Sequence, residues 1–148
     1  MLAQRARHFD IEEEVALQQK ISELIKNRVI ESAHDVSEGG LFVTLIESSF
    51  HRNLGIDVVA HNANIRKDAY WFGEAQSRVV VSVSAANLAR FKKIMGDHPF
   101  EELGEVTAGS VEVDGQNWGM ILDWKEKYDT AIENLLRGHE SEHALSAL

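Results

Sequence analysis

The 148-residue chain has no cysteine and a single proline, and aromatic residues make up only 7% of it. Without cysteine, disulfide bonds and thiolate-based metal or redox sites are excluded. No apolar run approaches the roughly 20 residues that a membrane-spanning helix needs, and the first residues lack the apolar segment of a signal peptide. A cytoplasmic protein without a membrane partner is the simplest expectation.

Basic residues are also scarce, because 15 Lys and Arg against 24 Asp and Glu give a net charge of −9. Nucleic acid is therefore not an expected partner, since phosphate backbones are held by clustered Lys and Arg. The hydrophobic fraction of 44% and the charged fraction of 26% are those of an ordinary globular protein. We expect one domain over residues 1–148, with loosely ordered tails at 1–9 and 139–148.

Periodic apolar residues predict four helices. Asp10 and Glu13 form a capping-box pattern that begins the first helix, which is expected to end near Val29. The second begins at residues 39–40 and runs to about residue 51, with apolar residues round most of its circumference and therefore heavily buried. The third follows Ser84 and ends at residue 96. The last begins near residue 123 and ends near residue 138, with an apolar stripe formed by Trp124, Tyr128, Ile132 and Leu135.

Short apolar segments predict the strands. Residues 56–59 and 79–83 are expected strands, and the second is apolar enough to be central and covered on both faces. Residues 100–107 should return beside it in a right-handed βαβ unit, whereas residues 60–69 are polar and expected to form a loop or a brief irregular element. Residues 111–120 read as a hairpin turning at Asp114–Gly115. The order predicts an α/β (α+β) fold with helices packed on one mixed sheet, partly ferredoxin-like.

The stretch HDVSEGGL at residues 34–41 is the most informative one for function. Two adjacent glycines at a helix start leave the first backbone N–H groups reachable, and the helix dipole favours a phosphate or carboxylate there. Ser37, Gly39 and Gly40 are therefore candidate anion-binding residues. The alternative is a tight turn with Ser37 as the N-cap.

A second polar cluster, WFGEAQSR at residues 71–78, stands directly before an expected strand. Glu74, Gln76 and Arg78 would bring a carboxylate, an amide and a bidentate anion binder to one place. The alternative is a surface loop with a salt bridge. Trp71 and Phe72 are expected to anchor a core or an interface.

His34 and Asp35 are adjacent, which suggests an acid–base pair. Neighbours on a strand or turn point away from each other, however, so we predict that both residues structure the loop and that no residue is catalytic. Four other histidines show no metal-ligand spacing with neighbouring carboxylates, so no metal site is predicted: His61, His98, His139 and His143.

The two clusters, in this order and spacing, resemble the carboxy-terminal (AIR-synthase-related) domain of phosphoribosylformylglycinamidine synthase, also called FGAM synthase or PurL. The matching stretches are FDIEEE at residues 9–14, SAHDVSEGGL at 32–41 and FGEAQSR at 72–78. The resemblance covers roughly residues 9–135. It implies a layered domain like the carboxy-terminal domain of aminoimidazole ribonucleotide synthetase (PurM).

The resemblance also implies a function. The family enzyme is an ATP-dependent ligase of purine biosynthesis that converts formylglycinamide ribonucleotide and glutamine-derived ammonia to formylglycinamidine ribonucleotide. ATP and Mg²⁺ would be held largely by a preceding domain, so this chain alone should bind neither and be inactive. The implied partners are that N-terminal domain, the glutaminase subunit and, through an exposed sheet edge or face, a second copy of the chain.

Within the resemblance, Gly39 and Gly40 would hold a phosphate through backbone N–H groups, Glu74 and Gln76 would contact ribose or base hydroxyls, and Arg78 would be a counter-ion. Ala75 replaces a serine often found in the family. The family enzymes contain two copies of the two-domain unit, and this chain resembles the last, less active copy. An aminoimidazole ribonucleotide synthetase-type domain and a non-catalytic docking domain stay open as alternatives.

Overall fold

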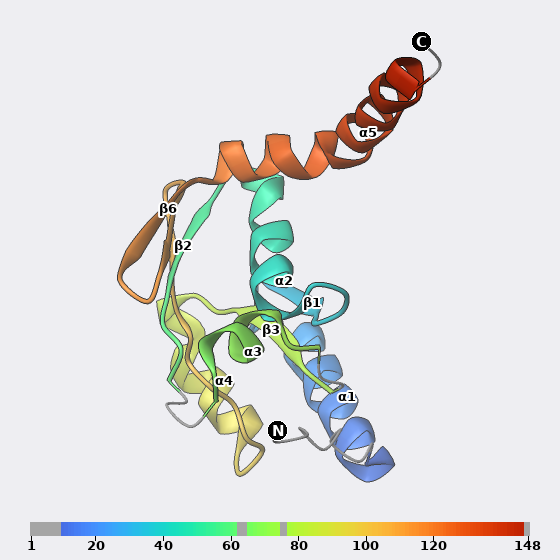
Figure 1. The fold of residues 1–148 in the computed structure, drawn as a ribbon. Coiled ribbons are helices and arrows are strands. Elements are labelled where there is room, and N and C mark those ends of the chain that lie inside the picture. The colour runs from blue at the N-terminus through green and yellow to red at the C-terminus, as the bar shows by residue number, and fades with distance from the viewer. Residues whose placement is uncertain (1–9, 62–64, 75–76, 147–148) are drawn as a thin grey trace. The chain divides into compact units, whose positions relative to one another are not determined.

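The computed structural model describes residues 10–61, 65–74 and 77–146, and side chains as far as residue 137. Its helices are α1 (Ile11–Lys26), α2 (Gly40–Ser49), α3 (Lys67–Phe72), α4 (Leu88–Met95) and α5 (Ile121–Ser146), with short 3₁₀ turns η1 (Phe50–Arg52) and η2 (Ala85–Asn87). Its strands are β1 (Ser32–Asp35), β2 (Gly55–Val58), β3 (Val79–Ser82), β4 (Gly104–Thr107), β5 (Ser110–Val113) and β6 (Gln116–Met120) (Figure 1). The predicted class, a mixed α+β fold with helices and a mixed sheet, is confirmed.

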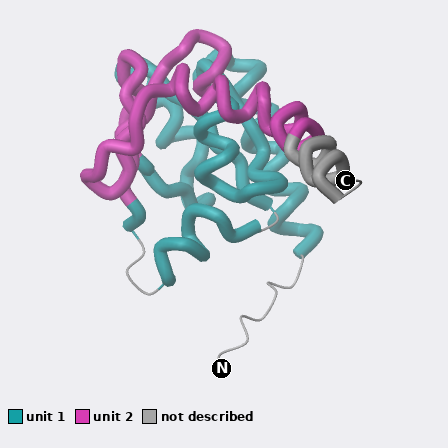
Figure 2. The backbone as a smooth tube through the Cα atoms, turned by 45° about the horizontal axis from the view of Figure 1, so that its top comes forward, with its two compact units in different colours: residues 1–48, 60–103 teal, residues 49–59, 104–148 magenta. Residues whose placement is uncertain are grey.

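The chain divides into two compact units, shown in different colours in Figure 2. Unit 1 comprises residues 1–48 and 60–103, and unit 2 comprises residues 49–59 and 104–148. Each unit has a separate sheet, two-stranded in unit 1 and four-stranded in unit 2. The expectation of one sheet is therefore wrong for the described residues.

In unit 1, α1 begins as its capping pattern predicts. The Asp10 carboxylate accepts the backbone N–H groups of Glu12 and Glu13 at 2.8 and 3.3 Å. The inner face of α1 packs against α4 through a core of fully or nearly buried side chains: Leu24, Val29, Phe91 and Met95. Val81 of β3 packs against the same core, so the two helices and the strand form one cluster.

The sheet of unit 1 differs from the prediction for residues 79–83. Within the described residues, β3 pairs with β1 alone, antiparallel, from Ser32↔Ser82 to Asp35↔Val79. All four β3 residues are half-buried, so β3 is not a central strand covered on both faces. Residues 67–69, at the end of the segment expected to be a loop or a brief irregular element, are instead the first residues of α3, which buries Tyr70 and Trp71.

The sheet of unit 2 has the order β4–β2–β5–β6. Strands β2 and β5 are parallel, and their register places Ile56 beside Val111 and Val58 beside Val113, all buried. The predicted hairpin is confirmed: β5 and β6 are antiparallel, and the turn at Asp114–Gly115 has φ values of 53° and 72°. Two positive φ angles are what a type I′ turn requires.

The predicted βαβ unit is wrong. Only residues 104–107 of the expected 100–107 strand form a strand, and β4 pairs antiparallel with β2 rather than with β3. The physical reason is the charge of this segment, which carries Glu101, Glu102 and Glu105. Such a segment suits a solvent-facing edge, and Val106 of β4 is 57% exposed.

The last helix is longer than predicted. α5 begins at Ile121, where the Asp123 carboxylate accepts the N–H of Met120 at 3.4 Å, and it continues through Gly138 to Ser146. Near its start, the ring of Tyr128 tilts against Phe50 at 5.4 Å between centroids. Among the described residues, no helix is both long enough and apolar enough to pass through a bilayer.

Candidate functional site

The glycine pair opens α2 as predicted. The Gly40 N–H donates to the Ser37 carbonyl oxygen at 3.1 Å and closes a turn, in which Gly39 and Gly40 have φ values of 82° and 72°. A Cβ on Gly40 would lie 2.6 Å from the carbonyl carbon of Phe72, and one on Gly39 would lie 2.6 Å from Cγ2 of Val43. Both positions therefore require glycine for their backbone conformation and for close packing.

The pairing of β1 with β3 brings the two sequence clusters together. The Val36 N–H donates to the Arg78 carbonyl oxygen at 2.9 Å, and the Gly39 N–H donates to Oε1 of Glu74 at 3.2 Å. Ser37, Gly39, Gly40, Glu74 and Arg78 thus lie in one region of unit 1, while Gln76 lies outside the described residues. The region is open to solvent, because Ser37 and Glu74 are exposed.

The Glu74 carboxylate is the anion that the start of α2 holds in this structure. It accepts the Gly39 N–H directly before α2, where the helix dipole favours negative charge. The alternative was a surface loop with a salt bridge. Among the described residues, no ion pair joins Glu74 to Arg78, so Glu74 does not form that salt bridge. The half-buried Arg78 instead lies within electrostatic range of Tyr70.

Tyr70 connects α3 to the segment before β4. Its hydroxyl donates to the Glu101 carboxylate at 2.8 Å, and its ring packs edge-on against Trp71 at 4.9 Å between centroids. Burial raises the pKa of Tyr70 and the bond to Glu101 raises it further, while the positive charge of Arg78 acts in the opposite direction. Trp71 is a core residue, as expected, whereas Phe72 is 48% exposed and contacts Phe42 edge-on.

His34 and Asp35 do not share a proton. Nδ1 of His34 lies 2.9 Å from the backbone carbonyl oxygen of Asp35, not from its carboxylate, and Nε2 lies 3.7 Å from the Glu47 carboxylate of α2. His34 thus links β1 to α2, and Asp35 is exposed. In the part of the chain that the structure describes, no three His, Asp or Glu side chains gather in a way that could hold a metal ion.

One contact of the second cluster had no signal in the sequence. Ser77, with φ 60°, donates its hydroxyl to Oε2 of Glu14 on α1 at 2.5 Å, although 63 positions separate the two residues. Gln18 donates to the other oxygen of the same carboxylate at 2.8 Å. Both hydrogen bonds lower the pKa of Glu14 below its ordinary value of 4.5, and the bond from Ser77 has the larger effect. Glu14 therefore tethers the loop that carries Glu74 and Arg78.

We expect Glu14→Gln to destabilise the fold near neutral pH and to have little effect in acid. The folded-state pKa of Glu14 is lowered, so its ionised form contributes stability above pH 4.5, and that contribution is lost as pH falls through the lowered pKa. Urea unfolding of the native sequence and the variant should therefore differ at about pH 7, and the difference should shrink as the pH falls below 4.5.

Glu12→Gln is the matched control, because it removes the same charge from the first turn of the same helix. An identical pH dependence for the two variants would contradict the Glu14 tether.

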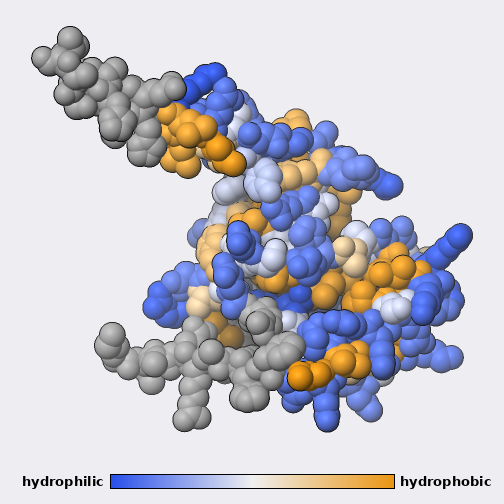
Figure 3. Space-filling view, turned by 90° about the vertical axis from the view of Figure 1, so that its right-hand side faces the viewer, coloured by the Kyte–Doolittle hydropathy of each residue, from blue (hydrophilic) through white to orange (hydrophobic). Residues whose placement is uncertain are grey.

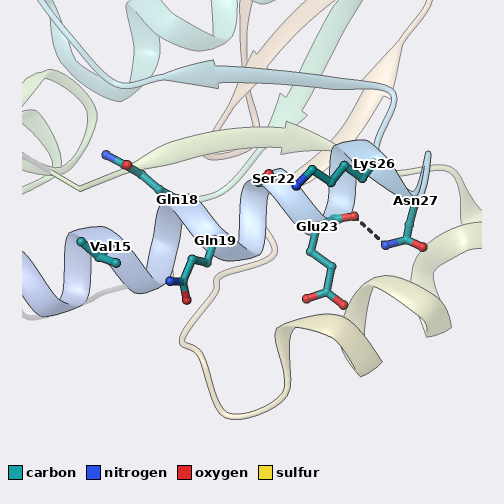
Figure 4. Close-up of a pocket in the computed structure, with 7 residues that line it drawn as sticks. All are labelled: Val15, Gln18, Gln19, Ser22, Glu23, Lys26 and Asn27. Carbon is teal, nitrogen blue, oxygen red and sulfur yellow. Dashed lines mark hydrogen bonds between the residues drawn. The ribbon is translucent and has the colours of Figure 1, made fainter.

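Two hollows of the described surface lie elsewhere. The one in Figure 4 is lined by α1 side chains and by Asn27, whose amide donates to the Glu23 carbonyl oxygen at 2.9 Å. A second one lies along the apolar side of α1, next to Val79. Neither includes the glycine turn. Because Ser37 and Glu74 are exposed, a ligand or a facing domain would have to cover the candidate site.

The chain is thus a mixed α+β domain in which a helix begins at a pair of glycines, next to a polar loop. Residues 6–115 match the family model described as AIR synthase related protein, C-terminal domain, and the chain belongs to this family. It is 47% identical over 100 residues to phosphoribosylformylglycinamidine synthase subunit PurL of Leuconostoc mesenteroides. That match covers 68% of this chain and 13% of the relative, so the chain spans about an eighth of it.

Two solved structures are similar in fold. The Thermotoga maritima PurL complexed with FGAR has a TM-score of 0.64 at 21% identity, covering 75% of this chain and 20% of that one. The PurL of the same organism complexed with ATP has a TM-score of 0.60 at 20% identity, covering 72% and 20%. The predicted kinship with the carboxy-terminal domain of FGAM synthase is thereby confirmed.

Proposed function

We propose that this chain supplies ribose-phosphate or nucleotide-binding groups to an FGAM synthase. The reaction is the ATP-dependent conversion of formylglycinamide ribonucleotide and glutamine-derived ammonia to formylglycinamidine ribonucleotide. The observation that carries the proposal is the β1–β3 pairing, which places the glycine turn beside the loop of Glu74 and Arg78. The identity to PurL subunits supports the same reaction.

The bond between Gly39 and Glu74 suggests how a ligand would enter. A phosphate oxygen that accepts the Gly39 N–H would replace the Glu74 carboxylate at that donor. The released carboxylate has only acceptor oxygens, so it suits the hydroxyl donors of a ribose. Arg78 would then hold the phosphate from the side of β3, and Gln76 remains part of the proposed set.

The proposal places the rest of the chemistry outside this chain. Phosphoryl transfer from ATP uses Mg²⁺ held by carboxylates and an in-line arrangement shielded from water. The described residues do not form a Mg²⁺ site, and Ser37 and Glu74 are exposed. We therefore assign the Mg²⁺ ligands and the cover of the site to another domain of the longer enzyme, and the ammonia supply to a glutaminase partner.

Arg78→Lys in the complete synthase is expected to weaken binding of formylglycinamide ribonucleotide. A lysine keeps the charge but loses the planar two-donor geometry, so we expect about a tenfold rise in Kd, with a larger rise for Arg78→Ala. Calorimetric titration measures both. Arg66→Lys is the control, because Arg66 is an exposed guanidinium paired with Asp68 in the same unit. Unchanged affinity in both Arg78 variants would assign Arg78 a structural role.

A further inference from the structure

The segment FDIEEE, of which the structure describes residues 10–14, does more than begin a helix. Asp10 caps α1. One turn later, the Glu14 carboxylate accepts the hydroxyl of Ser77 at 2.5 Å and the amide of Gln18 at 2.8 Å. Glu14 thus connects α1 to the residue directly before Arg78, a contact with the candidate site to which the proposed function assigns no role.

Ser77 holds a backbone conformation that a serine rarely adopts without support. Its φ is 60°, in the left-handed region, where the Cβ of an L-residue crowds the following carbonyl oxygen. A free serine populates this region about a tenth of the time or less. The bond from the Ser77 hydroxyl ends on a carboxylate, and such charge-assisted bonds are stronger than neutral ones. The bond to Glu14 therefore stabilises the left-handed form.

Position 77 lies between the two charged groups of the candidate site. Three residues before it, the Glu74 carboxylate accepts the Gly39 N–H at 3.2 Å. Directly after it, the Arg78 carbonyl oxygen accepts the Val36 N–H at 2.9 Å, and β3 begins with the next residue. A change of φ at position 77 rotates the chain before it relative to the chain after it. Such a change would alter how Glu74 and Arg78 are directed relative to each other.

The Glu14 end of the contact is fixed. α1 packs against α4 through Leu24, and Glu14 and Gln18 line the same hollow as Val79 of β3. Figure 3 views the molecule from the side where Figure 1 shows α1, and hydrophobic residues lie among hydrophilic ones on this face. Glu14 is half-buried, and each of its carboxylate oxygens accepts one hydrogen bond. Its position is therefore set by α1 and not by the loop that contains Ser77.

We propose that Glu14 is a positioning residue for the ligand at the glycine turn. By holding Ser77 in the left-handed conformation, it directs Arg78 and Glu74 toward a bound ribose phosphate without contacting that ligand itself. The inference rests on the proposed function, because it takes Arg78 and Glu74 as ligand-binding groups. It adds α1 to the two sequence clusters as a third part of the site.

Calorimetric titration of the complete synthase with formylglycinamide ribonucleotide tests the proposal. Glu14→Ala removes the acceptor, keeps a strong helix former in α1, and should raise Kd about five- to tenfold, because the binding-competent conformation is then less populated. Ser77→Ala removes the donor and should raise Kd by a similar factor. The double variant should bind no more weakly than either single variant, since all three lack the same bond. Glu12→Ala, at an exposed position of the same helix, should leave Kd unchanged.

Glycine at position 77 separates positioning from stability. Glycine adopts a positive φ without the steric cost, so Glu14→Ala combined with Ser77→Gly should bind within about twofold of the native enzyme. If the contact served stability alone, Glu14→Ala would lower Tm, and Kd measured well below Tm would not change. The Tm of every variant is therefore measured in the titration buffer.

Arg78→Ala in the same titration distinguishes failure of this inference from failure of the proposed function. A rise in Kd for Arg78→Ala with none for Glu14→Ala would overturn the role of Glu14 and leave the proposed function standing. An unchanged Kd for Arg78→Ala would overturn the proposed function and with it this inference, whatever the Glu14 variants show. Equal losses for Glu14→Ala with serine or with glycine at position 77 would also overturn the positioning role, because the bond would then not act through φ.

Discussion

Gly40→Ala is expected to destabilise the protein by about 3 kcal/mol or more, a large share of the stability of a domain of this size. A left-handed backbone costs an alanine roughly 1–2 kcal/mol. The added Cβ would also lie 2.6 Å from the Phe72 carbonyl carbon and 2.9 Å from its Cα and carbonyl oxygen. Backbone atoms at the end of α3 cannot rotate away as a side chain would, so the start of α2 or the end of α3 must shift. Denaturant unfolding measures the loss.

Gly115→Ala separates the two causes. Gly115 has the same φ of 72°, but a Cβ there would meet nothing within 4 Å. We expect it to cost only the conformational part, roughly 1–2 kcal/mol. If both variants lose the same stability, the contact with Phe72 does not constrain position 40. For the same reason, Gly40→Asp would be a poor probe of phosphate binding, since its added charge and this clash would act together.

The 148-residue chain alone is expected to release no ADP when supplied with formylglycinamide ribonucleotide, ATP, Mg²⁺ and ammonia. Its proposed groups are backbone N–H donors, Glu74 and Arg78, which can bind a ligand from one exposed side. They cannot hold the metal or align ammonia with the activated amide, and these tasks account for most of the rate of phosphoryl transfer enzymes. A coupled ADP assay measures turnover, with a complete PurL enzyme in parallel as the positive control. ADP release that depends on both substrate and ammonia would contradict the expectation.

The local features of the fold could be predicted because they follow from neighbouring residues. Asp10 caps α1, Gly96 ends α4 with φ 57°, and Asp114–Gly115 turns the hairpin, each through the backbone conformation or hydrogen bond that its side chain allows. The opening of α2 at Gly40 belongs to the same group. In each case the decisive interaction spans at most a few residues.

The long-range pairings could not be predicted. Strand β1 carries Ser32, His34 and Asp35, which favour loops as much as strands, and its extended form depends on β3 fifty residues away. The apolar residues at 79–83 predict a strand, but they do not say which other strand pairs with it. The tether from Glu14 to Ser77 was missed for the same reason, because it joins an exposed helix position to a loop through one hydrogen bond.

The order of the units along the sequence has a consequence for how such a domain can change over evolution. Strand β2 belongs to unit 2, yet residues on both sides of it belong to unit 1, and its hydrogen-bonding neighbours β4 and β5 come from the far end of the chain. A stop codon after residue 103 would remove both neighbours of β2. The apolar side chains of Ile56 and Val58 would then have no sheet in which to be buried. Unit 2 therefore cannot be acquired or shed by a single terminal event, and the two units must be inherited as one piece.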